Sequence, residues 1–483
     1  MIEPTYTHAR AHEYARPGGP LDLPTLDVAL SHAGARGDVV VDATERLSAD
    51  EVETRVARVA GGLIEAGIRP GDAVSWQRPN GVDAAVLYRA CWRAGAVAVP
   101  VHHLAGASDH DVIVEETAPG LFVDDELPQG EPVPPDGSRA QRDGAAVVLF
   151  TSGSSGRPKG VVHTHRSLTY KARLMARVHG LGSDDAVLMP APLAHISGLL
   201  NGVMLPGVVP MKSVLMAKWD VDHALEVIER ERITFMIGPP TFFIGLMGAR
   251  SFSADAVASL RLISCGGAGV TPAFVEEASA KLDCVVKRTY GSTEAPTITT
   301  TQVGDDAAMG ATTDGRATGA VELAVDEATG ELLVRAPELF SGYTDRARND
   351  DAFTGDGWFR TGDLGTIDGG WLTITGRLKD VIIRGGENVS TAEVEATLEA
   401  HPDVRHAVAV GAPDARLGER VVAYVQVAPG STFGLDECRT WFATHGVARF
   451  KTPEKVVAVD EFPLLAAGKP DRAALRARAA SED

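Results

Sequence analysis

Cysteine is scarce in this chain of 483 residues, which contains four. Cys91, Cys265, Cys284 and Cys438 lie far apart in the sequence, and no two of them form a C-x-x-C pair. This spacing favours neither a disulfide framework nor a zinc site. The simplest interpretation is a protein that works in the reducing environment of the cytoplasm.

Long hydrophobic runs are also missing. The most apolar long stretch, residues 199–217, is interrupted by asparagine, proline and lysine, so it predicts a buried segment and not a membrane span. Residues 1–20 lack the apolar core of a secretory signal, and we expect no such signal.

Basic residues are outnumbered by acidic ones. The chain carries 46 Lys and Arg against 65 Asp and Glu, a formal net charge of −19. A field of this sign repels nucleic-acid phosphates and anionic lipid headgroups, so neither nucleic acid nor a membrane is an expected partner. An anionic substrate would have to be held by a local cluster of donors. The length and the 44% hydrophobic content predict two or more globular domains, and the oligomeric state stays open.

One segment rich in Gly, Ser and Thr has the composition of a phosphate-binding loop, TSGSSGRPKG at residues 151–160. Its glycines let backbone N–H groups approach an anion, and Lys159 supplies a point charge. A P-loop needs G-x-x-x-x-G-K-[ST] at the start of a helix, whereas β-branched residues that predict a strand follow Lys159 and Gly160. The segment is therefore not a P-loop. If it stood alone, a tight surface hairpin would be the default interpretation.

The first part of the chain alternates helical and strand patterns. Ser48 and Glu51 form a capping-box pattern, and apolar residues then recur at helical spacing until Gly67. Residues 127–144 are rich in Pro, Gly and charge and predict a surface loop. The remaining predictions in this part are strands at 72–77, 96–101 and 145–150 and a helix at 81–95. The alternation predicts α/β layering.

The pattern changes near Gly376. Short strand and turn patterns come first, and then Ser390 and Glu393 cap a predicted helix that runs through His401. Strand patterns follow at 407–413, 421–427 and 455–462, with a helical stretch between the second and the third. About a hundred residues of α+β pattern are enough for a small domain. We therefore expect a boundary near Leu378 to Asp380, with domains 1–378 and 379–483.

Six motifs occur in order along nearly the whole chain: TSGSSGRPKG (151–160), APLAHISG (191–198), YGSTEA (290–295), WFRTGD (358–363), GRLKDVIIRGGENVS (376–390) and GKPDR (468–472). In this order they resemble the adenylate-forming superfamily, which comprises acyl-CoA synthetases, adenylation domains of peptide synthetases and luciferases. Two departures occur. Thr391 stands where a proline is common, and the sequence LLAAGK lacks the usual hydroxyl residue before Gly468.

The resemblance implies an α/β fold. A large N-terminal domain would combine layered sheets and helices with a small β-barrel-like part, and a small mobile α+β domain would follow. It also implies a two-step reaction. ATP activates a carboxylic acid as an acyl adenylate with release of pyrophosphate, and a thiol, usually coenzyme A, then displaces AMP. Such an enzyme must hold the triphosphate, grip the ribose and steady developing charge.

The resemblance also implies the nucleotide-binding residues. Thr293 would donate to the α-phosphate, Glu294 would coordinate Mg²⁺, and the remaining contacts would come from Thr151, Ser152, Gly153, Ser155, Lys159, Gly267, Ala268, Tyr290, Gly291 and Ser292. Each residue also has a simpler interpretation. Lys159 could be a solvated loop lysine, Tyr290 a buried structural tyrosine and Glu294 a member of a surface ion pair.

The later motifs supply the ribose contacts and the catalytic lysine. Asp363, with Arg377 beside it, would accept both ribose hydroxyls, and the alternative for Asp363 is a turn-capping role after Gly362. Lys469 would bridge the α-phosphate and the attacking carboxylate, which cancels repulsion between two anions. An isolated lysine in a tail would instead be a solvated charge.

The acyl pocket, the CoA channel and a hinge follow from the same resemblance. Acyl-pocket positions are His195, Ile196, Ser197, Pro239, Phe242 and Gly266, and CoA-channel positions are Arg384, Gly385 and Gly386. Lys379 matches the hinge, although a simple charged turn is the alternative. His195 could equally be a satisfied core histidine. The pairs His102/His103 and His163/His165 lack the helical H-E-x-x-H pattern, so we do not expect them to bind metal.

The composition of the predicted acyl pocket limits the acid. Residues 191–198, 238–243 and 262–269 contain no Asp, Glu, Lys or Arg, so an amino acid would bury an unpaired ammonium there. We expect an apolar acid, whether short- to medium-chain fatty, alicyclic or aromatic, and free coenzyme A as the acceptor. Alternatives are a ligase that loads a carrier protein, a luciferase-type oxygenase and a catalytically inactive nucleotide-binding homologue.

Overall fold

The computed structural model describes residues 1–151, 157–267, 269–302, 304–414, 416–428, 430–464 and 470–481. Contacts divide the chain into two compact units. The larger comprises Met1–Leu323, Val334–Phe359 and Gly369–Leu372, and the smaller comprises Ala324–Leu333, Arg360–Asp368 and Thr373–Asp483. The expected mixed α/β class, with a large unit and a smaller one, is confirmed. The domain boundary at 378/379 stays a prediction.

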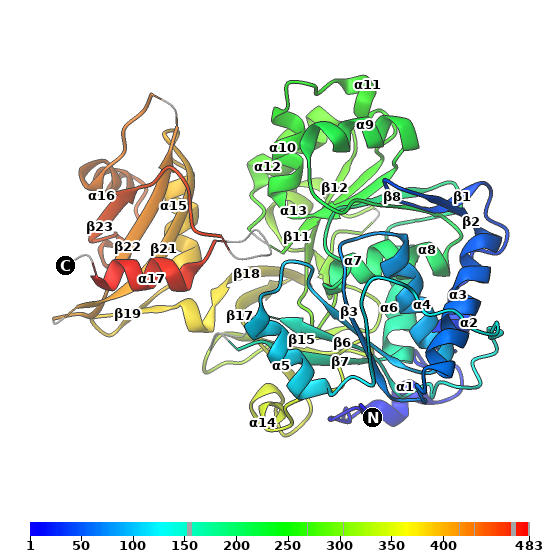
Figure 1. Cartoon of the computed structure of the whole chain (residues 1–483). Coiled ribbons are helices and arrows are strands. Elements are labelled where there is room, and N and C mark those ends of the chain that lie inside the picture. The colour runs from blue at the N-terminus through cyan, green and yellow to red at the C-terminus, as the bar shows by residue number, and fades with distance from the viewer. Residues whose placement is uncertain are drawn as a thin grey trace. The chain divides into compact units, whose positions relative to one another are not determined.

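A parallel sheet forms one half of the larger unit (Figure 1). Its neighbouring strands are, in order, β9 (Lys212–Leu215), β8 (Ala186–Met189), β10 (Phe235–Gly238), β11 (Leu262–Gly266) and β12 (Val285–Tyr290). At one end β1 (Asp38–Val41) pairs parallel with β9 and antiparallel with β2 (Arg46–Ser48). At the other end β13 (Thr299–Thr300) pairs antiparallel with β12 and with β14 (Arg316–Ala317). The connecting helices are α9 (Val221–Glu231), α10 (Pro240–Gly248), α11 (Ala254–Val257), α12 (Pro272–Leu282) and α13 (Ala307–Thr312).

A second sheet of the larger unit confirms the strand predictions. Its order is β5 (Leu121–Val123), β3 (Ala73–Gln77), β4 (Val97–Val101), β6 (Ala145–Thr151) and β7 (Lys159–Thr164). β6 and β7 are antiparallel, with Thr151 opposite Lys159. The glycine-rich segment is thus flanked by two strands and is not followed by a helix, as its sequence indicates. No helix or strand lies between β5 and β6, which confirms the loop at 127–144.

The helices next to this sheet form because their sequences encode both the caps and the apolar faces. α3 (Ala49–Glu65) begins with the expected capping box, in which the Ser48 amide donates to Glu51 at 2.8 Å. α4 (Val82–Ala94) is buried along nearly its whole length and ends at Gly95, whose φ of 77° suits a residue without Cβ. The other helices of this half are α1 (Ala11–Ala15), α2 (Leu26–Ala29), α5 (Ala107–Thr117), α6 (His165–Val178) and α14 (Arg348–Ala352).

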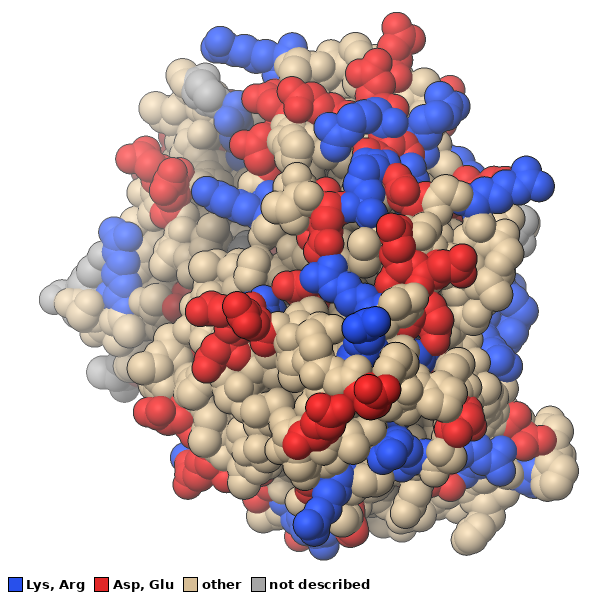
Figure 2. All heavy atoms as spheres, turned by 45° about the vertical axis from the view of Figure 1, so that its right-hand side comes forward, with Lys and Arg blue, Asp and Glu red and all other residues tan. Residues whose placement is uncertain are grey.

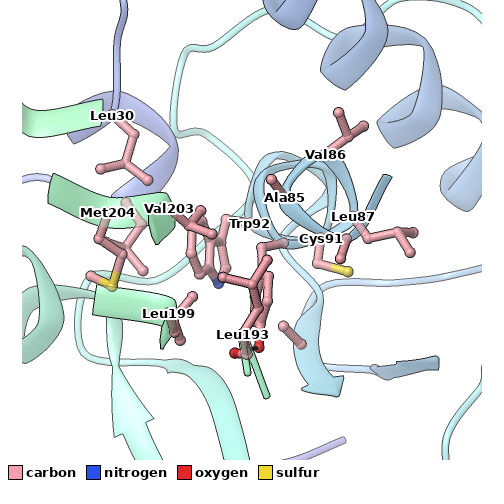
Figure 3. Close-up of a cluster of buried hydrophobic side chains, with 14 of the residues drawn as sticks. Leu30, Ala85, Val86, Leu87, Cys91, Trp92, Leu193, Leu199, Val203 and Met204 are labelled. Carbon is pink, nitrogen blue, oxygen red and sulfur yellow. Dashed lines mark hydrogen bonds between the residues drawn. The ribbon is translucent and has the colours of Figure 1, made fainter. Parts of the chain in front are cut away.

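The main core surrounds α4 (Figure 3). Trp92 and Cys91 of α4 are fully buried and lie in one cluster with Leu193, Leu199 and Val203. The indole of Trp92 donates a hydrogen bond to the Ala146 carbonyl of β6 at 2.9 Å, which satisfies its buried N–H.

The apolar stretch 199–217 lies in this core as expected. It forms the end of α7 (Ile196–Leu199), the π-helix η1 (Leu200–Met204), α8 (Leu205–Val208) and strand β9. Among the described residues, no helix is both long enough and apolar enough to span a membrane.

The smaller unit contains an α+β sandwich at its C-terminal end (Figure 1). Successive side chains of β21 pack alternately against two helical layers, because side chains along a strand point to opposite faces. Ala407 and Ala409 share a cluster with Leu398 of α15, whereas Val408 and Val410 share one with Leu475 of α17. Its elements are η2 (Leu378–Asp380), β19 (Ile382–Arg384), β20 (Glu387–Val389), α15 (Thr391–Glu399), β21 (Val404–Asp414), β22 (Gly418–Val427), α16 (Leu435–Thr444), η3 (Arg449–Lys451), β23 (Lys455–Ala458) and α17 (Arg472–Ser481).

The rest of the smaller unit comes from parts of two hairpins, whose remaining residues belong to the larger unit. These are formed by β15 (Glu322–Val325) with β16 (Glu331–Arg335) and by β17 (Phe359–Asp368) with β18 (Trp371–Arg377). On the face of the molecule shown in Figure 2, acidic and basic side chains are interspersed and do not form a large patch of one sign.

Candidate active site

Four predicted site segments follow neighbouring parallel strands at their carboxyl ends. Residues 190–198 follow β8, 239–243 follow β10, 267–270 follow β11 and 291–296 follow β12. In an open parallel sheet, loops at this edge lie side by side, and ligands bind there. The structure thus collects His195, Pro239, Phe242, Gly267 and Gly291 at one edge, although they are spread over nearly a hundred positions.

The segment before His195 is fixed by hydrogen bonds to Asn80 and Tyr88 of the neighbouring core. The side-chain amide of Asn80 donates to the carbonyls of Met189 and Ala191 at 3.2 and 2.8 Å, and its oxygen accepts from the Leu193 amide at 2.8 Å. The hydroxyl of Tyr88 donates to the Leu193 carbonyl at 2.6 Å. These bonds fix the chain that leads to His195.

His195 begins α7 as its N-cap residue, and Ile196 and Ser197 form the first turn. Its ring lies 5.1 Å from the His102 ring, which in turn stacks on His103 at 4.7 Å. Burial lowers the pKa of both His102 and His103, and the neighbouring His103 adds to the effect on His102. These neutral rings stand beside an acyl-pocket position. In the described part of the chain, no group of three or more His, Cys, Asp or Glu side chains is arranged to hold a metal ion.

The other acyl-pocket positions show tight local packing. A Cβ at Gly266 would lie 2.2 Å from the Thr289 carbonyl oxygen, so the neighbouring strand excludes any side chain at this position. Phe242 of α10 stacks on Trp219 with the ring centroids 4.4 Å apart. Pro239 is the N-cap residue of the same helix. The predicted acyl-pocket segment 238–243 is therefore mainly apolar and aromatic, as its sequence indicates.

The YGSTEA loop after β12 is pinned at successive residues. The Ser292 hydroxyl accepts from the Ala295 amide at 3.2 Å, and the Glu294 carbonyl accepts from the Phe340 amide at 2.9 Å. His163 of β7 donates from Nε2 to the Thr293 carbonyl at 2.7 Å, because a carbonyl can only accept. Burial lowers the pKa of His163 to about 4, so the ring is neutral at pH 7. His163 is thus a structural clamp of this loop.

Glu294 is the centre of a compact polar group with Lys159 and Tyr343. Lys159 Nζ lies 2.5 Å from Glu294 Oε1 and 3.0 Å from the Tyr343 hydroxyl, which itself donates to Glu294 Oε1 at 2.8 Å. The ammonium also lies 4.7 Å from the centre of the Tyr343 ring. Two residues that the sequence assigns to phosphate and metal binding therefore meet directly. Lys159 is thus not a freely solvated lysine, and Glu294 does form an ion pair, one in which its own side chain is buried.

The electrostatics of this group follow from its burial. The Glu294 side chain is 8% exposed and that of Lys159 is 26% exposed. Burial alone would raise the pKa of the Glu294 carboxyl, but the Lys159 ammonium and the Tyr343 hydroxyl outweigh it, and the pKa lies below its ordinary value. Burial and the neighbouring carboxylate raise the pKa of Tyr343, so its hydroxyl remains a donor.

The start of the glycine-rich segment presents one unsatisfied group. The hydroxyl of Thr151, the last residue of β6, is buried and has no hydrogen-bond partner in the part of the chain that the structure describes. Thr151 stands opposite Lys159 in the β6–β7 pairing. Ser152, Gly153 and Ser155, as well as Ala268 and Lys469, lie outside the described residues, and their assignments stay predictions.

The predicted ribose contacts meet within the smaller unit. Arg377 Nε lies 3.0 Å from Asp363 Oδ1, and the Asp363 side chain is largely buried. Gly362 has a φ of 72° and donates from its amide to Glu331 at 2.9 Å, which sets the turn before Asp363. The carboxylate of Asp363 thus forms an ion pair with Arg377, and its ribose role stays a prediction.

The predicted CoA-channel residues lie at the turn between β19 and β20 of the smaller unit. Gly385 and Gly386 have φ values of 60° and 91°, which favour glycine, and the Gly385 amide donates to the Leu417 carbonyl at 2.6 Å. Arg384 Nε donates to Glu454 at 2.7 Å. Lys379 lies in the short helix η2 and is exposed. The hinge and channel roles stay predictions.

Three residues contact the predicted site segments although no motif assigns them to the site. Tyr343, His163 and Asn80 each act through contacts to residues distant in sequence, and none belongs to a motif that names its partner. The sequence SGYT around Tyr343 does not indicate that its hydroxyl contacts Glu294, which lies 49 positions earlier. For His163, the sequence argues only against a metal ligand, and its hydrogen bond to the Thr293 carbonyl depends on the fold.

Family models match most of the chain. The model described as AMP-binding enzyme covers residues 31–344, and that of the AMP-binding enzyme C-terminal domain covers residues 393–469. The chain is 32% identical to the medium-chain fatty-acid–CoA ligase of Escherichia coli (strain K12), over 86% of this chain and 83% of that protein. It is 33% identical to a feruloyl-CoA synthase of Amycolatopsis sp, over 87% and 91%.

Solved structures agree with these relatives. The ATP-bound MatB of Rhodopseudomonas palustris superimposes with a TM-score of 0.85 at 26% identity, over 92% of this chain and 96% of that one. The chain belongs to the AMP-binding enzyme family, whose adenylate-forming fold it shares. It is accordingly an AMP-forming acid–thiol ligase.

Proposed function

We propose that this enzyme couples an apolar carboxylic acid to coenzyme A through an acyl adenylate, with ATP and Mg²⁺ as the other reactants. The observation that carries the proposal is the buried group of Lys159, Glu294 and Tyr343 beside the carboxyl edge of a parallel sheet. Two of the relatives are named for a medium-chain fatty acid and for a feruloyl group. Both names describe acids whose bulk is hydrocarbon or aromatic, which supports the apolar class.

The residues present fit ATP and Mg²⁺. Mg²⁺ is typically held by one or two carboxylates together with substrate phosphates, and Glu294 supplies one buried carboxylate. Lys159 supplies a cation whose side chain retains access to solvent and can pair with a phosphate. The buried hydroxyl of Thr151, which has no hydrogen-bond partner among the described residues, adds a donor. The bound metal would neutralise phosphate charge during adenylation.

Other roles follow as parts of the same proposal. Thr293 would donate to the α-phosphate, the carboxylate of Asp363 would accept the ribose hydroxyls beside Arg377, and Lys469 would bring the two reacting anions together. Tyr290, Gly291 and Gly267 would contact the adenine. The free, buried state of all four cysteines is compatible with the predicted cytoplasmic location.

The acid should carry no charge beyond its carboxylate. Residues 191–198, 238–243 and 262–269 contain no Asp, Glu, Lys or Arg, and burial of an unpaired substrate charge against them would be costly. We expect hexanoate, cyclohexanecarboxylate or benzoate to be turned over faster than malonate or any amino acid. Faster turnover of malonate or of an amino acid would refute this substrate class.

The test is pyrophosphate release with this panel of acids, with and without coenzyme A, and with Glu294→Gln as the matched control. Acid-dependent release that Glu294→Gln abolishes, followed by CoA-dependent release of AMP, would support the proposal. Acid-dependent release without any effect of CoA would favour carrier-protein loading. ATP binding without release for any acid would identify a catalytically inactive homologue.

The two half-reactions separate the roles of the C-terminal residues. Lys469→Ala should abolish adenylation but spare thioester formation from a supplied acyl adenylate, since the charge is needed only where two anions meet. Lys379→Pro, which fixes φ near −65°, should leave adenylation measurable and slow thioester formation. Single-turnover measurements check both. Equal losses in the two steps for Lys469→Ala, or none for Lys379→Pro, would contradict these assignments.

A further inference from the structure

Tyr343 is the member of the polar group that the family motifs do not assign. Its side chain is 5% exposed, and its hydroxyl accepts from Lys159 at 3.0 Å and donates to Glu294 Oε1 at 2.8 Å. The Lys159 ammonium and the Tyr343 hydroxyl therefore converge on the same carboxylate oxygen. Of these two donors, one is charged and mobile at the end of a flexible chain, whereas the other is neutral and sits on a rigid ring.

The backbone around Tyr343 is fixed on several sides. The residue bridges Val161 of β7 in antiparallel fashion, and its amide donates to the side chain of Asn349 at 2.9 Å. Its carbonyl accepts from the Thr5 hydroxyl at 2.7 Å, so the N-terminal segment helps to hold it. The ring lies 4.8 Å from that of Phe340, whose amide binds the Glu294 carbonyl. The hydroxyl is thus placed by the scaffold and independently of Lys159.

Tyr343 becomes important for Glu294 when a bound phosphate pairs with Lys159. A buried carboxylate that loses its cation is destabilised and free to change rotamer, unless another donor holds it. We propose that Tyr343 is a positioning residue for Glu294. The Tyr343 hydroxyl holds one oxygen of the Glu294 carboxylate in place while Lys159 pairs with phosphate. This positioning raises the affinity of the site for Mg²⁺. This inference rests on the proposed function, because it assumes that Lys159 and Glu294 bind phosphate and metal.

The test is ATP binding by calorimetry, once in MgCl₂ and once in EDTA, with the full-length protein. The ratio of the two dissociation constants measures how much Mg²⁺ strengthens ATP binding. Tyr343→Phe should reduce this ratio about tenfold, the effect of losing one hydrogen bond to a charged group. Phenylalanine keeps the ring packing, and the thermal midpoint of unfolding monitors the fold.

Tyr170→Phe is the matched control. Tyr170 is also buried, and its hydroxyl also has a protein partner, the Ala320 amide at 3.1 Å, but neither contacts Glu294. This variant should leave the ratio unchanged. A double-mutant cycle sharpens the test, because in the Glu294→Gln background Tyr343→Phe should cause no further reduction.

The outcomes separate the inference from the proposed function. An unchanged ratio in Tyr343→Phe, an equal reduction in Tyr170→Phe, or a full effect in the Glu294→Gln background would overturn the positioning role. Mg²⁺-dependent ATP binding without acid-dependent pyrophosphate release would defeat the proposed function alone. A wild-type protein that binds no ATP would defeat both.

Discussion

Removing the Lys159 charge should destabilise the protein through the carboxylate that it leaves behind. In Lys159→Met the side chain keeps an unbranched apolar stem, but Glu294, 8% exposed, loses its cation. The Tyr343 hydroxyl at 2.8 Å remains as a neutral donor. The reverse variant, Glu294→Gln, leaves an ammonium on a side chain that is 26% exposed and that can turn to water. The two single variants should therefore differ in cost.

The expected magnitudes follow from this asymmetry. Breaking a buried ion pair from one side costs about 3–5 kcal/mol. Because Tyr343 still donates, we expect Lys159→Met to cost about 2–3 kcal/mol of unfolding free energy. Glu294→Gln should cost about 1 kcal/mol, since one charge-assisted hydrogen bond is replaced by a neutral one. The double variant should cost less than the sum of the singles, because it leaves no buried charge unpaired.

The pH dependence gives an independent check. In the wild-type protein the pKa of Glu294 is lowered, so its contribution is present above the unfolded value of 4.5 and is lost as pH falls through the folded value. Without Lys159, burial raises the folded pKa above 4.5, and stability is instead lost as pH rises through it. The difference between the two proteins should therefore be large at pH 7.5 and small near pH 4.5.

Urea unfolding of the four proteins, followed by tryptophan fluorescence at both pH values, measures these differences. Strictly additive losses of the two single variants would refute the reasoning. So would a difference between wild type and Lys159→Met that does not shrink on acidification.

Two further predictions concern stability. Gly342→Ala would place a Cβ 2.1 Å from the Thr5 hydroxyl at a φ of 95°, so it should cost about 2–4 kcal/mol and speed amide hydrogen exchange at Thr5. Gly34→Ala, at a φ of 87° with no atom within 4 Å, should cost about 1–2 kcal/mol, and equal costs would contradict the clash. Acid should also destabilise the protein, because burial lowers the pKa of His163 to about 4, and of His32, His165 and His179 to about 3. The unfolded chain binds more protons below the ordinary value of 6.5, so each histidine should cost about 1.4 kcal/mol per pH unit as pH falls from 6.5 toward 4, and a thermal midpoint that is flat across this range would refute the prediction.

Local signals explain which elements could be predicted from sequence. The capping box at Ser48 and Glu51 is a short-range device that needs no tertiary partner, and α3 begins where it indicates. The helix expected at 81–95 is observed at Val82–Ala94, and Gly95 ends it in the left-handed conformation. The segment 199–217 could be predicted as buried, but its π-helix could not, because no residue pattern distinguishes that winding from an α-helix.

Long-range contacts explain what the sequence could not supply. The resemblance implies binding roles for Lys159 and Glu294 separately, but it does not indicate that they pair with each other across 135 positions. Arg384 was identified by its position in a motif, yet its partner Glu454 lies 70 residues further on. Fully buried pairs such as Lys171 with Glu338, 3.0 Å apart, carry no local signal either, because each residue alone predicts an exposed charge.

Charge balance connects the acidic composition with an anionic substrate. The net charge of −19 repels ATP at a distance, and in the structure the Lys159 cation is already neutralised by Glu294. On the proposed assignment, metal-free ATP would take Lys159 and leave a buried carboxylate without a cation beside phosphate, which is doubly unfavourable. On the same assignment, Mg²⁺ arriving with ATP would remove both costs, because phosphate would pair with Lys159 while the metal would pair with Glu294. Such an exchange would leave no charge in the group uncompensated, so we expect the site to prefer the metal complex of the nucleotide before any chemistry occurs.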